Sequence, residues 1–125
     1  MRTESDEQIA LFEWSGLMLW KYPELARLVH IPNGGMRNPV VAAKLKSEGV
    51  KAGYPDLLLD VPRGGYHGLR IELKREKGGT VSPAQKDWLE FLSTQGYRAV
   101  VCNGFEAAKK EIEWYLRLEE QNDKL

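Results

Sequence analysis

The sequence predicts a three-layer α/β domain in which helices flank a central mixed β-sheet. Segments with helical spacing alternate with short apolar runs, in the order helix, strand, helix, strand, strand, helix, strand, helix. The chain has 125 residues, the usual size of one domain, so we expect a single domain over residues 1–125. Hydrophobic residues make up 42% of the chain, and 18 basic residues balance 18 acidic ones, which favours a folded globule over a disordered chain.

The first helix is expected over about residues 3–21. Two starting points are possible for this helix, because Thr3 with Asp6 and Ser5 with Gln8 both have the spacing of a capping box. Its buried face is predicted from apolar residues at helical spacing on either side of Gly16, namely Ile9, Phe12, Leu19 and Trp20.

A short strand over residues 28–31 and the turn-forming sequence HIPNGG follow. Asn38 and Pro39 suit the N-cap and first turn of a second helix over residues 40–48, which ends at Gly49.

Two strands are then predicted to pair as a hairpin. Residues 56–61 form a compact buried strand, and PRGGYHG has the composition of a tight connection. Leu69, Ile71 and Leu73 alternate with charged residues, which predicts a half-buried strand.

Ser82, Pro83 and Gln85 have the pattern of a capping box and first-turn proline, so a third helix is expected up to Gly96. Its inward residues are predicted to be Ala84, Trp88, Leu89 and Leu92. A strand over residues 98–102, a helix over residues 105–116 and a polar tail over about residues 119–125 complete the chain.

Three charged residues of the hairpin suggest chemistry. Asp56 opens one strand, and Glu72 lies in the middle of the other, two residues before Lys74. Because strand side chains alternate, Glu72 and Lys74 share a face, and strand pairing can bring Asp56 beside Glu72. Two carboxylates suit Mg²⁺, and Lys74 would then stand beside an attacking water. The alternative is an ordinary solvent-exposed strand face.

Pro55, Asp56, Glu72, Leu73 and Lys74 match the PD-(D/E)XK nuclease signature. Together with HIPNGG, GVKAGYPD and ELKREKGGTVSPAQ, they make the chain from about residue 4 to residue 118 resemble a stand-alone VRR-NUC domain. The resemblance implies a restriction-endonuclease-like fold and a Mg²⁺-dependent DNA endonuclease, with Mn²⁺ able to substitute. It also implies a homodimer that acts on branched DNA such as Holliday junctions, in replication, recombination or repair.

By the same resemblance, Asp56 and Glu72 would be metal ligands, joined by the backbone carbonyl of Leu73. Lys74 would be the catalytic lysine, and Gln85 would order the active site in addition to capping its helix.

An acidic residue of the first helix is implied to complete the site. Glu4 fits best, because Glu4 and Gln8 match a pair in the family, and Glu7 is the alternative. Both residues can instead serve as an acidic first turn that complements the helix dipole.

Basic residues flank the proposed site. Residues 27–51 and 63–86 each carry a net charge of +4, although such runs are often only solvated surface. Phosphate contacts are expected from Arg37, Lys44, Lys51, Arg75 and Lys77. The glycines of residues 33–37 would let backbone amides approach a phosphate, unless this loop is an ordinary turn. His30, just before it, is either a structural strand residue or a catalytic one.

The single cysteine, Cys102, is expected to be a small buried residue. No apolar stretch approaches the length of a membrane span, and the acidic N-terminus is unlike a leader, so a cytoplasmic protein is expected. A bacterial or phage origin is suggested only by the family resemblance. Two other functions remain open: a catalytically silent DNA-binding or scaffold module, and a metal-independent protein-interaction domain.

Overall fold

The computed structural model describes residues 2–32 and 38–120. Its elements, in chain order, are α1 (Glu4–Leu17), the 3₁₀ helix η1 (Pro23–Arg27), β1 (Leu28–His30), α2 (Pro39–Ser47), β2 (Leu57–Leu59), β3 (Leu69–Lys74), α3 (Pro83–Thr94), β4 (Arg98–Asn103) and α4 (Phe105–Leu116). The predicted order of helices and strands is confirmed, with η1 as an addition after Pro23.

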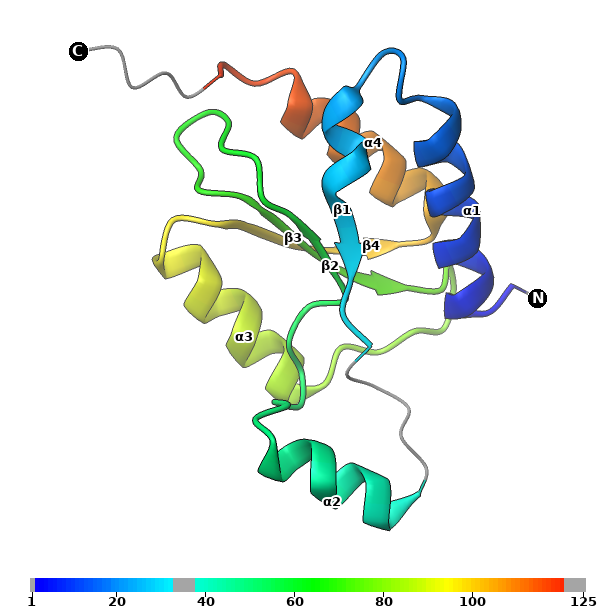
Figure 1. The fold of residues 1–125 in the computed structure, drawn as a ribbon, viewed down its shortest axis with the longest axis vertical. Helices are drawn as coiled ribbons and strands as arrows, with labels where there is room; N and C mark the ends of the chain where they lie inside the picture. Colours follow the sequence, from blue (N-terminus) through cyan, green and yellow to red (C-terminus); the bar gives the residue numbers. More distant parts are fainter. Residues whose placement is uncertain (1, 33–37, 121–125) are drawn as a thin grey trace.

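The four strands form one sheet in the order β1-β2-β3-β4. The first three strands pair antiparallel, and β4 pairs parallel to β3 after the crossover through α3. In Figure 1, α1 and α4 lie on one side of the sheet and α3 on the other, whereas α2 stands apart from all three layers. The predicted three-layer α/β fold with a mixed sheet is therefore confirmed.

The main core lies between the sheet and the helices α1 and α4. Leu57 and Ile71 from the sheet, Leu11 from α1 and Ile112 from α4 are at most 1% exposed. Each such side chain contributes about 1.5–3 kcal/mol by leaving water. This layer fixes α1 against β3, and α1 carries one wall of the candidate site.

Helix α1 buries a different face from the one predicted. Ile9 is 57% exposed and Trp20 is 79% exposed, and the helix ends at Leu17, so Leu19 and Trp20 lie beyond it. The residues that α1 buries are Glu7, Leu11, Trp14 and Ser15. Thr3 and Asp6 form the capping box, so of the two predicted pairs this one is present.

Strand β3 is buried on both faces, and the prediction of a half-buried strand is wrong. Its position between β2 and β4 places one face against α1 and α4 and the other toward α3. The charged side chains on the second face have polar partners: Arg70 pairs with Asp60 at 2.9 Å and Lys74 with Glu72 at 3.5 Å. Charges on this strand are therefore held inside the protein.

The predicted polar tail is anchored where it begins. The backbone carbonyl of Glu119 accepts a hydrogen bond from Gly64, and Glu120 lies 3.5 Å from Arg63. Residues 121–125 lie outside the described residues.

Candidate active site

One pocket gathers most of the residues that the sequence pointed to. It has a volume of about 550 Å³ and lies where the N-terminal ends of α1 and α3 meet the segments around β1, β2 and β3. Its lining residues are Glu4, Ser5, Gln8, His30, Pro32, Ala52, Gly53, Asp56, Glu72, Leu73 and Gln85.

Asp56 is held at this pocket by its side chain and its backbone. It directly precedes β2, which begins one residue later than predicted. Its Oδ2 accepts a hydrogen bond from the backbone amide of Leu73 at 2.9 Å. Its carbonyl oxygen accepts from the amide of Ile31 at 2.8 Å. These contacts tie Asp56 to both neighbouring strands and fix its carboxylate beside β3.

Glu72 is a carboxylate in a buried position, 2% exposed. Its Oε2 accepts a hydrogen bond from Nε2 of Gln85 at 3.2 Å and lies 3.5 Å from Nζ of Lys74. Its Oε1 is buried and has no hydrogen-bond partner among the described residues. Burial, followed by the nearby Asp56 carboxylate, raises the pKa of Glu72 to about 8, although Lys74 opposes the shift.

These donors fit a hard divalent cation. Within residues 2–32 and 38–120, no three His, Cys, Asp or Glu side chains group closely enough to hold a metal ion by themselves. Mg²⁺ does not require three, because it is commonly held by one or two carboxylates and keeps water or phosphate oxygens in its other positions. Asp56 and Glu72 can supply those two carboxylates, and a cation would relieve their repulsion and satisfy the unpartnered oxygen of Glu72. Leu73, predicted to contribute its carbonyl, lines the same pocket.

The side chain of Gln85 makes two contacts, of which the capping box was predicted. Its Oε1 accepts a hydrogen bond from the amide of Ser82 at 2.8 Å and completes the capping box of α3, while its Nε2 reaches Glu72. Lys74 is 7% exposed in its side chain and meets the site through Glu72. The helix cap thus also orients a carboxylate of the pocket.

The N-terminal end of α3 lies beside the pocket because the backbone at Ala84 packs closely against the backbone at Gly53. Gly53 has a φ of +90°, and a Cβ there would lie 2.6 Å from the carbonyl carbon of Ala84. Ala84 is itself exposed, contrary to the prediction of an inward residue, and Leu92 is the buried residue of the helix. Gly53 was not predicted from the sequence, and its positive φ is the feature that requires glycine.

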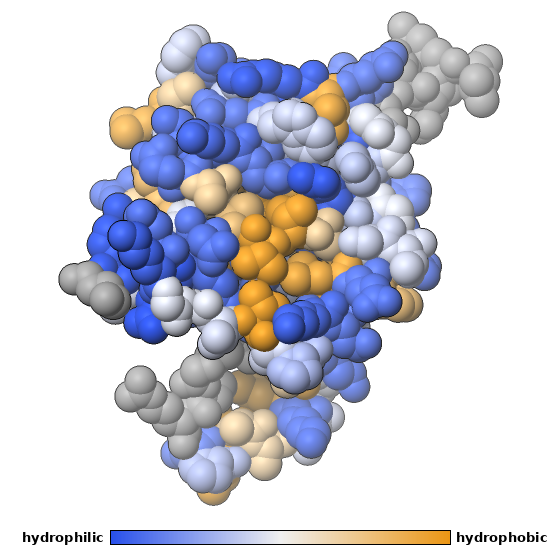
Figure 2. All heavy atoms as spheres, turned by 180° about the vertical axis from the view of Figure 1, so that it is seen from behind, coloured by the Kyte–Doolittle hydropathy of each residue, from blue (hydrophilic) through white to orange (hydrophobic). Residues whose placement is uncertain are grey.

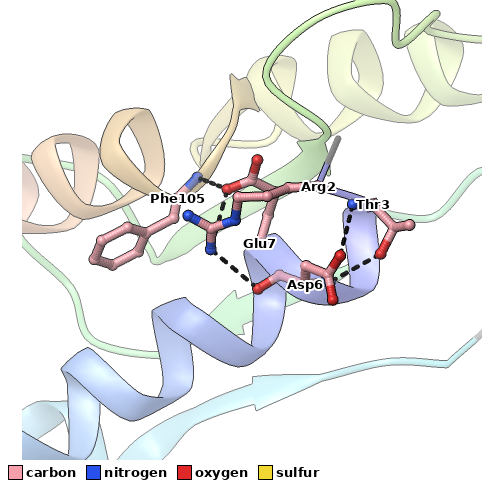
Figure 3. A network of polar contacts seen from close by, with 5 residues as sticks. All are labelled: Arg2, Thr3, Asp6, Glu7 and Phe105. Atoms are coloured by element: carbon pink, nitrogen blue, oxygen red, sulfur yellow. Dashed lines mark hydrogen bonds and ion pairs between the residues drawn. The ribbon is translucent and has the colours of Figure 1, made fainter.

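The two acidic candidates on α1 lie in different surroundings. Glu4 lines the pocket, whereas Glu7 is buried and turned toward α4. Figure 3 shows Oε1 of Glu7 accepting a hydrogen bond from the amide of Phe105 at 2.9 Å, with Arg2 beside it at 3.6 Å. Gly104, the N-cap of α4, has no side chain to cap the helix, and Glu7 takes that role.

None of the described residues that are expected to contact DNA lines the pocket. Lys44 on α2 is exposed, as are Lys51 and Lys77, and Arg75 donates a hydrogen bond to the carbonyl of Gly78 at 2.9 Å. Arg37 and the rest of the loop 33–37 lie outside the described residues.

Buried ion pairs reduce the basic surface that the charge count suggests. Arg63 lies 2.7 Å from Glu24 and Arg70 lies 2.9 Å from Asp60, and both arginines are 7% exposed in their side chains. Lys74 is also buried with Glu72. Half of the positive charges counted in residues 63–86 are therefore buried in ion pairs and not displayed on the surface.

The chain is similar to known proteins over most of its length. The model of the VRR-NUC domain family matches residues 5–106. A solved structure described as a VRR_NUC domain protein is 38% identical, with a TM-score of 0.85, and the similarity covers 100% of this chain and 98% of that one. No curated protein matches the chain. In the part of the chain that the structure describes, no helix is long and apolar enough to cross a membrane.

Proposed function

Because the chain belongs to the VRR-NUC domain family, we propose that it is a Mg²⁺-dependent DNA endonuclease that cleaves at the pocket formed by Asp56 and Glu72. The family accounts for a nuclease-type fold with a role in DNA processing. The observation that carries the catalytic proposal is the buried Glu72 carboxylate, which has an unpartnered oxygen and a raised pKa beside Asp56. A buried carboxylate oxygen without a hydrogen-bond partner is unfavourable for folding alone, so a functional partner accounts for it best.

In this proposal each side chain has a separate task. Bound Mg²⁺ would neutralise the carboxylates, polarise the phosphate and make an adjacent water more acidic. Asp56 and Glu72 hold the cation, and Gln85 keeps Glu72 in its orientation. Lys74 places positive charge beside Glu72, where negative charge develops on the phosphate during attack. Glu4 completes the acidic rim of the pocket from α1.

We further propose that the substrate is branched DNA and that the active unit is a homodimer. A two-fold dimer presents two pockets to a substrate that has two strands to cut. Figure 2 shows the molecule from behind, on the side opposite to strand β1 of Figure 1. Apolar residues gather in the middle of this face and are surrounded by hydrophilic ones. A contiguous apolar patch on a small protein is typical of an interaction surface and supports association of two copies.

Cleavage of DNA by purified variants tests the catalytic proposal. Four-way junctions, flaps and linear duplexes would be incubated with Mg²⁺, Mn²⁺ or a chelator. We expect cleavage with either metal and none with the chelator, and losses on the order of 10²-fold or more for Asp56→Asn and Lys74→Ala. Glu90→Gln and Lys110→Ala are matched controls, because both residues are exposed on helices and outside the pocket lining.

Each possible result has a definite meaning. Full activity in chelator, or in Asp56→Asn, would end the metallonuclease proposal. DNA binding without cleavage under any metal would identify the silent binding module instead. Equal rates on junctions, flaps and linear duplexes would refute the preference for branched substrates.

Sedimentation equilibrium over a wide concentration range tests the homodimer. The expected result is a dimer at the concentrations at which junctions are cleaved. A monomer that cleaves junctions at full rate would refute this part of the proposal and leave the catalytic part intact.

A further inference from the structure

We propose that the imidazole of His30 orients the attacking water of the reaction by accepting a hydrogen bond from it at Nε2. The inference rests on the proposed function, because it assigns a role within the same pocket.

The first step concerns the other ring nitrogen. Nδ1 of His30 lies 3.1 Å from the backbone carbonyl oxygen of Asp56. A carbonyl oxygen only accepts hydrogen bonds, so the proton of the neutral ring must be on Nδ1. The partner of one imidazole nitrogen fixes the tautomer, and here it leaves Nε2 with a free lone pair for accepting a hydrogen bond.

The second step concerns position. His30 is the last residue of β1, is exposed, and lines the pocket together with Asp56 and Glu72. The Asp56 carbonyl that holds the ring also accepts a hydrogen bond from the amide of Ile31 at 2.8 Å, so the contact continues the pairing of β1 with β2. The ring is therefore held from one side by the residue whose carboxylate faces the cation site.

The third step concerns chemistry. The acidic side chains of the pocket are Glu4, Asp56 and Glu72, and the last two are committed to the cation in the proposed function. The attacking water needs an acceptor that does not compete for the metal as an anion. Nε2 of a neutral imidazole provides one, and a fixed tautomer means that its direction is set before the DNA binds.

The step balances without a further reactant. The water oxygen forms the new bond to phosphorus while the phosphorus–oxygen bond to the leaving strand breaks. The released proton passes to solvent, and the leaving oxygen takes up a proton from solvent. His30 holds one O–H of the water during attack and forms no covalent bond.

Two substitutions separate the nitrogens of the ring. His30→Asn can keep a donor at the position of Nδ1 and has nothing at the position of Nε2, whereas His30→Gln reaches the position of Nε2. Under single turnover with saturating Mg²⁺, we expect His30→Asn to lower the cleavage rate on the order of 10²-fold. The KM for DNA should stay unchanged, and His30→Gln should recover part of the rate.

Two readouts do not depend on cleavage. In a ¹⁵N spectrum of the metal-free protein at about pH 8, His30 should carry its proton on Nδ1. Calorimetric titration with Mn²⁺ alone should give the same affinity for His30→Asn and the wild type, because the ring is not a metal ligand in this proposal. Weakened Mn²⁺ binding would overturn it.

The remaining outcomes are also decisive. Full activity of His30→Asn would show that the ring acts only through Asp56, and a loss confined to KM would assign it to DNA binding. A proton on Nε2 in the wild-type spectrum would likewise overturn the inference, even if a variant failed to fold. An inactive wild type would instead refute the proposed function, which keeps the two failures distinguishable.

Discussion

Replacing Glu72 by glutamine should stabilise the metal-free protein and abolish its stabilisation by Mg²⁺. Burial and the Asp56 carboxylate raise the pKa of Glu72 from 4.5 to about 8 in the folded protein. The folded state therefore binds more protons than the unfolded state between these pH values, and the free energy of unfolding falls as the pH rises through this window. At about 1.4 kcal/mol per tenfold change in proton affinity, ionised Glu72 lowers that free energy on the order of 5 kcal/mol above pH 8.

Urea denaturation in chelator, at intervals from about pH 5 to pH 8.5, measures this effect. The wild type should lose several kcal/mol relative to Glu72→Gln across the range, since titrating groups that do not interact with Glu72 cancel in the comparison. Glu90→Gln, an exposed carboxylate on α3, should follow the wild type. At about pH 8, Mg²⁺ at 100 times its Kd should restore about 2.7 kcal/mol to the wild type and nothing to Glu72→Gln.

A difference between wild type and Glu72→Gln that stays constant from pH 5 to pH 8 would refute the electrostatic reasoning. Equal stabilisation of both proteins by Mg²⁺ would show that the cation binds elsewhere.

Three further substitutions follow from local geometry and are measured by urea denaturation. In Gly53→Ala the new Cβ would meet the backbone of Ala84, and alanine would have to adopt an unfavourable φ. The substitution should destabilise the protein by more than about 1 kcal/mol and slow cleavage by displacing α3. Unchanged stability would contradict the close approach of the two backbones. Gly16→Ala, inside α1 with open space around it, should stabilise by about 0.5–1 kcal/mol, and a loss would show that this face is in contact. Glu7→Ala should lower the free energy of unfolding by about 2–3 kcal/mol, because the amide of Phe105 loses its acceptor and a cavity forms. Glu7→Gln keeps an acceptor and should lower it by less than about 1 kcal/mol. Equal losses in the two variants would show that Glu7 does not cap α4.

The order of elements was predictable because each helix and strand carries its own signals, whereas the buried faces were not. Helix α1 has apolar residues around much of its circumference: Leu11 and Trp14 are buried, Phe12 packs against the edge of the core, and Ile9 faces outward. Local spacing cannot choose between them, since the choice depends on packing against the sheet. The alternation in β3 indicates exposure only when its polar residues face water. Here Arg70, Glu72 and Lys74 are buried instead and have polar partners inside the protein.

The site divides in the same way. Asp56, Glu72 and Lys74 were predictable as neighbours, because strand alternation and hairpin pairing are short-range rules. The choice between Glu4 and Glu7 was not, because both lie in the first turn of one helix. It depends on the amide of Phe105, which is 98 residues from Glu7 in the chain.

That bond gives α4 a remote influence on a pocket to which none of its residues contributes a lining side chain. Glu7 and Glu4 are one turn apart on a rigid helix, so anchoring the first also sets how far the second enters the pocket. If the first turn of α4 loosened, α1 would move with it and Glu4 would lose its position in the pocket relative to Asp56 and Glu72. An unbiased screen for inactive variants should therefore recover substitutions around Gly104 and Phe105, which do not line the pocket.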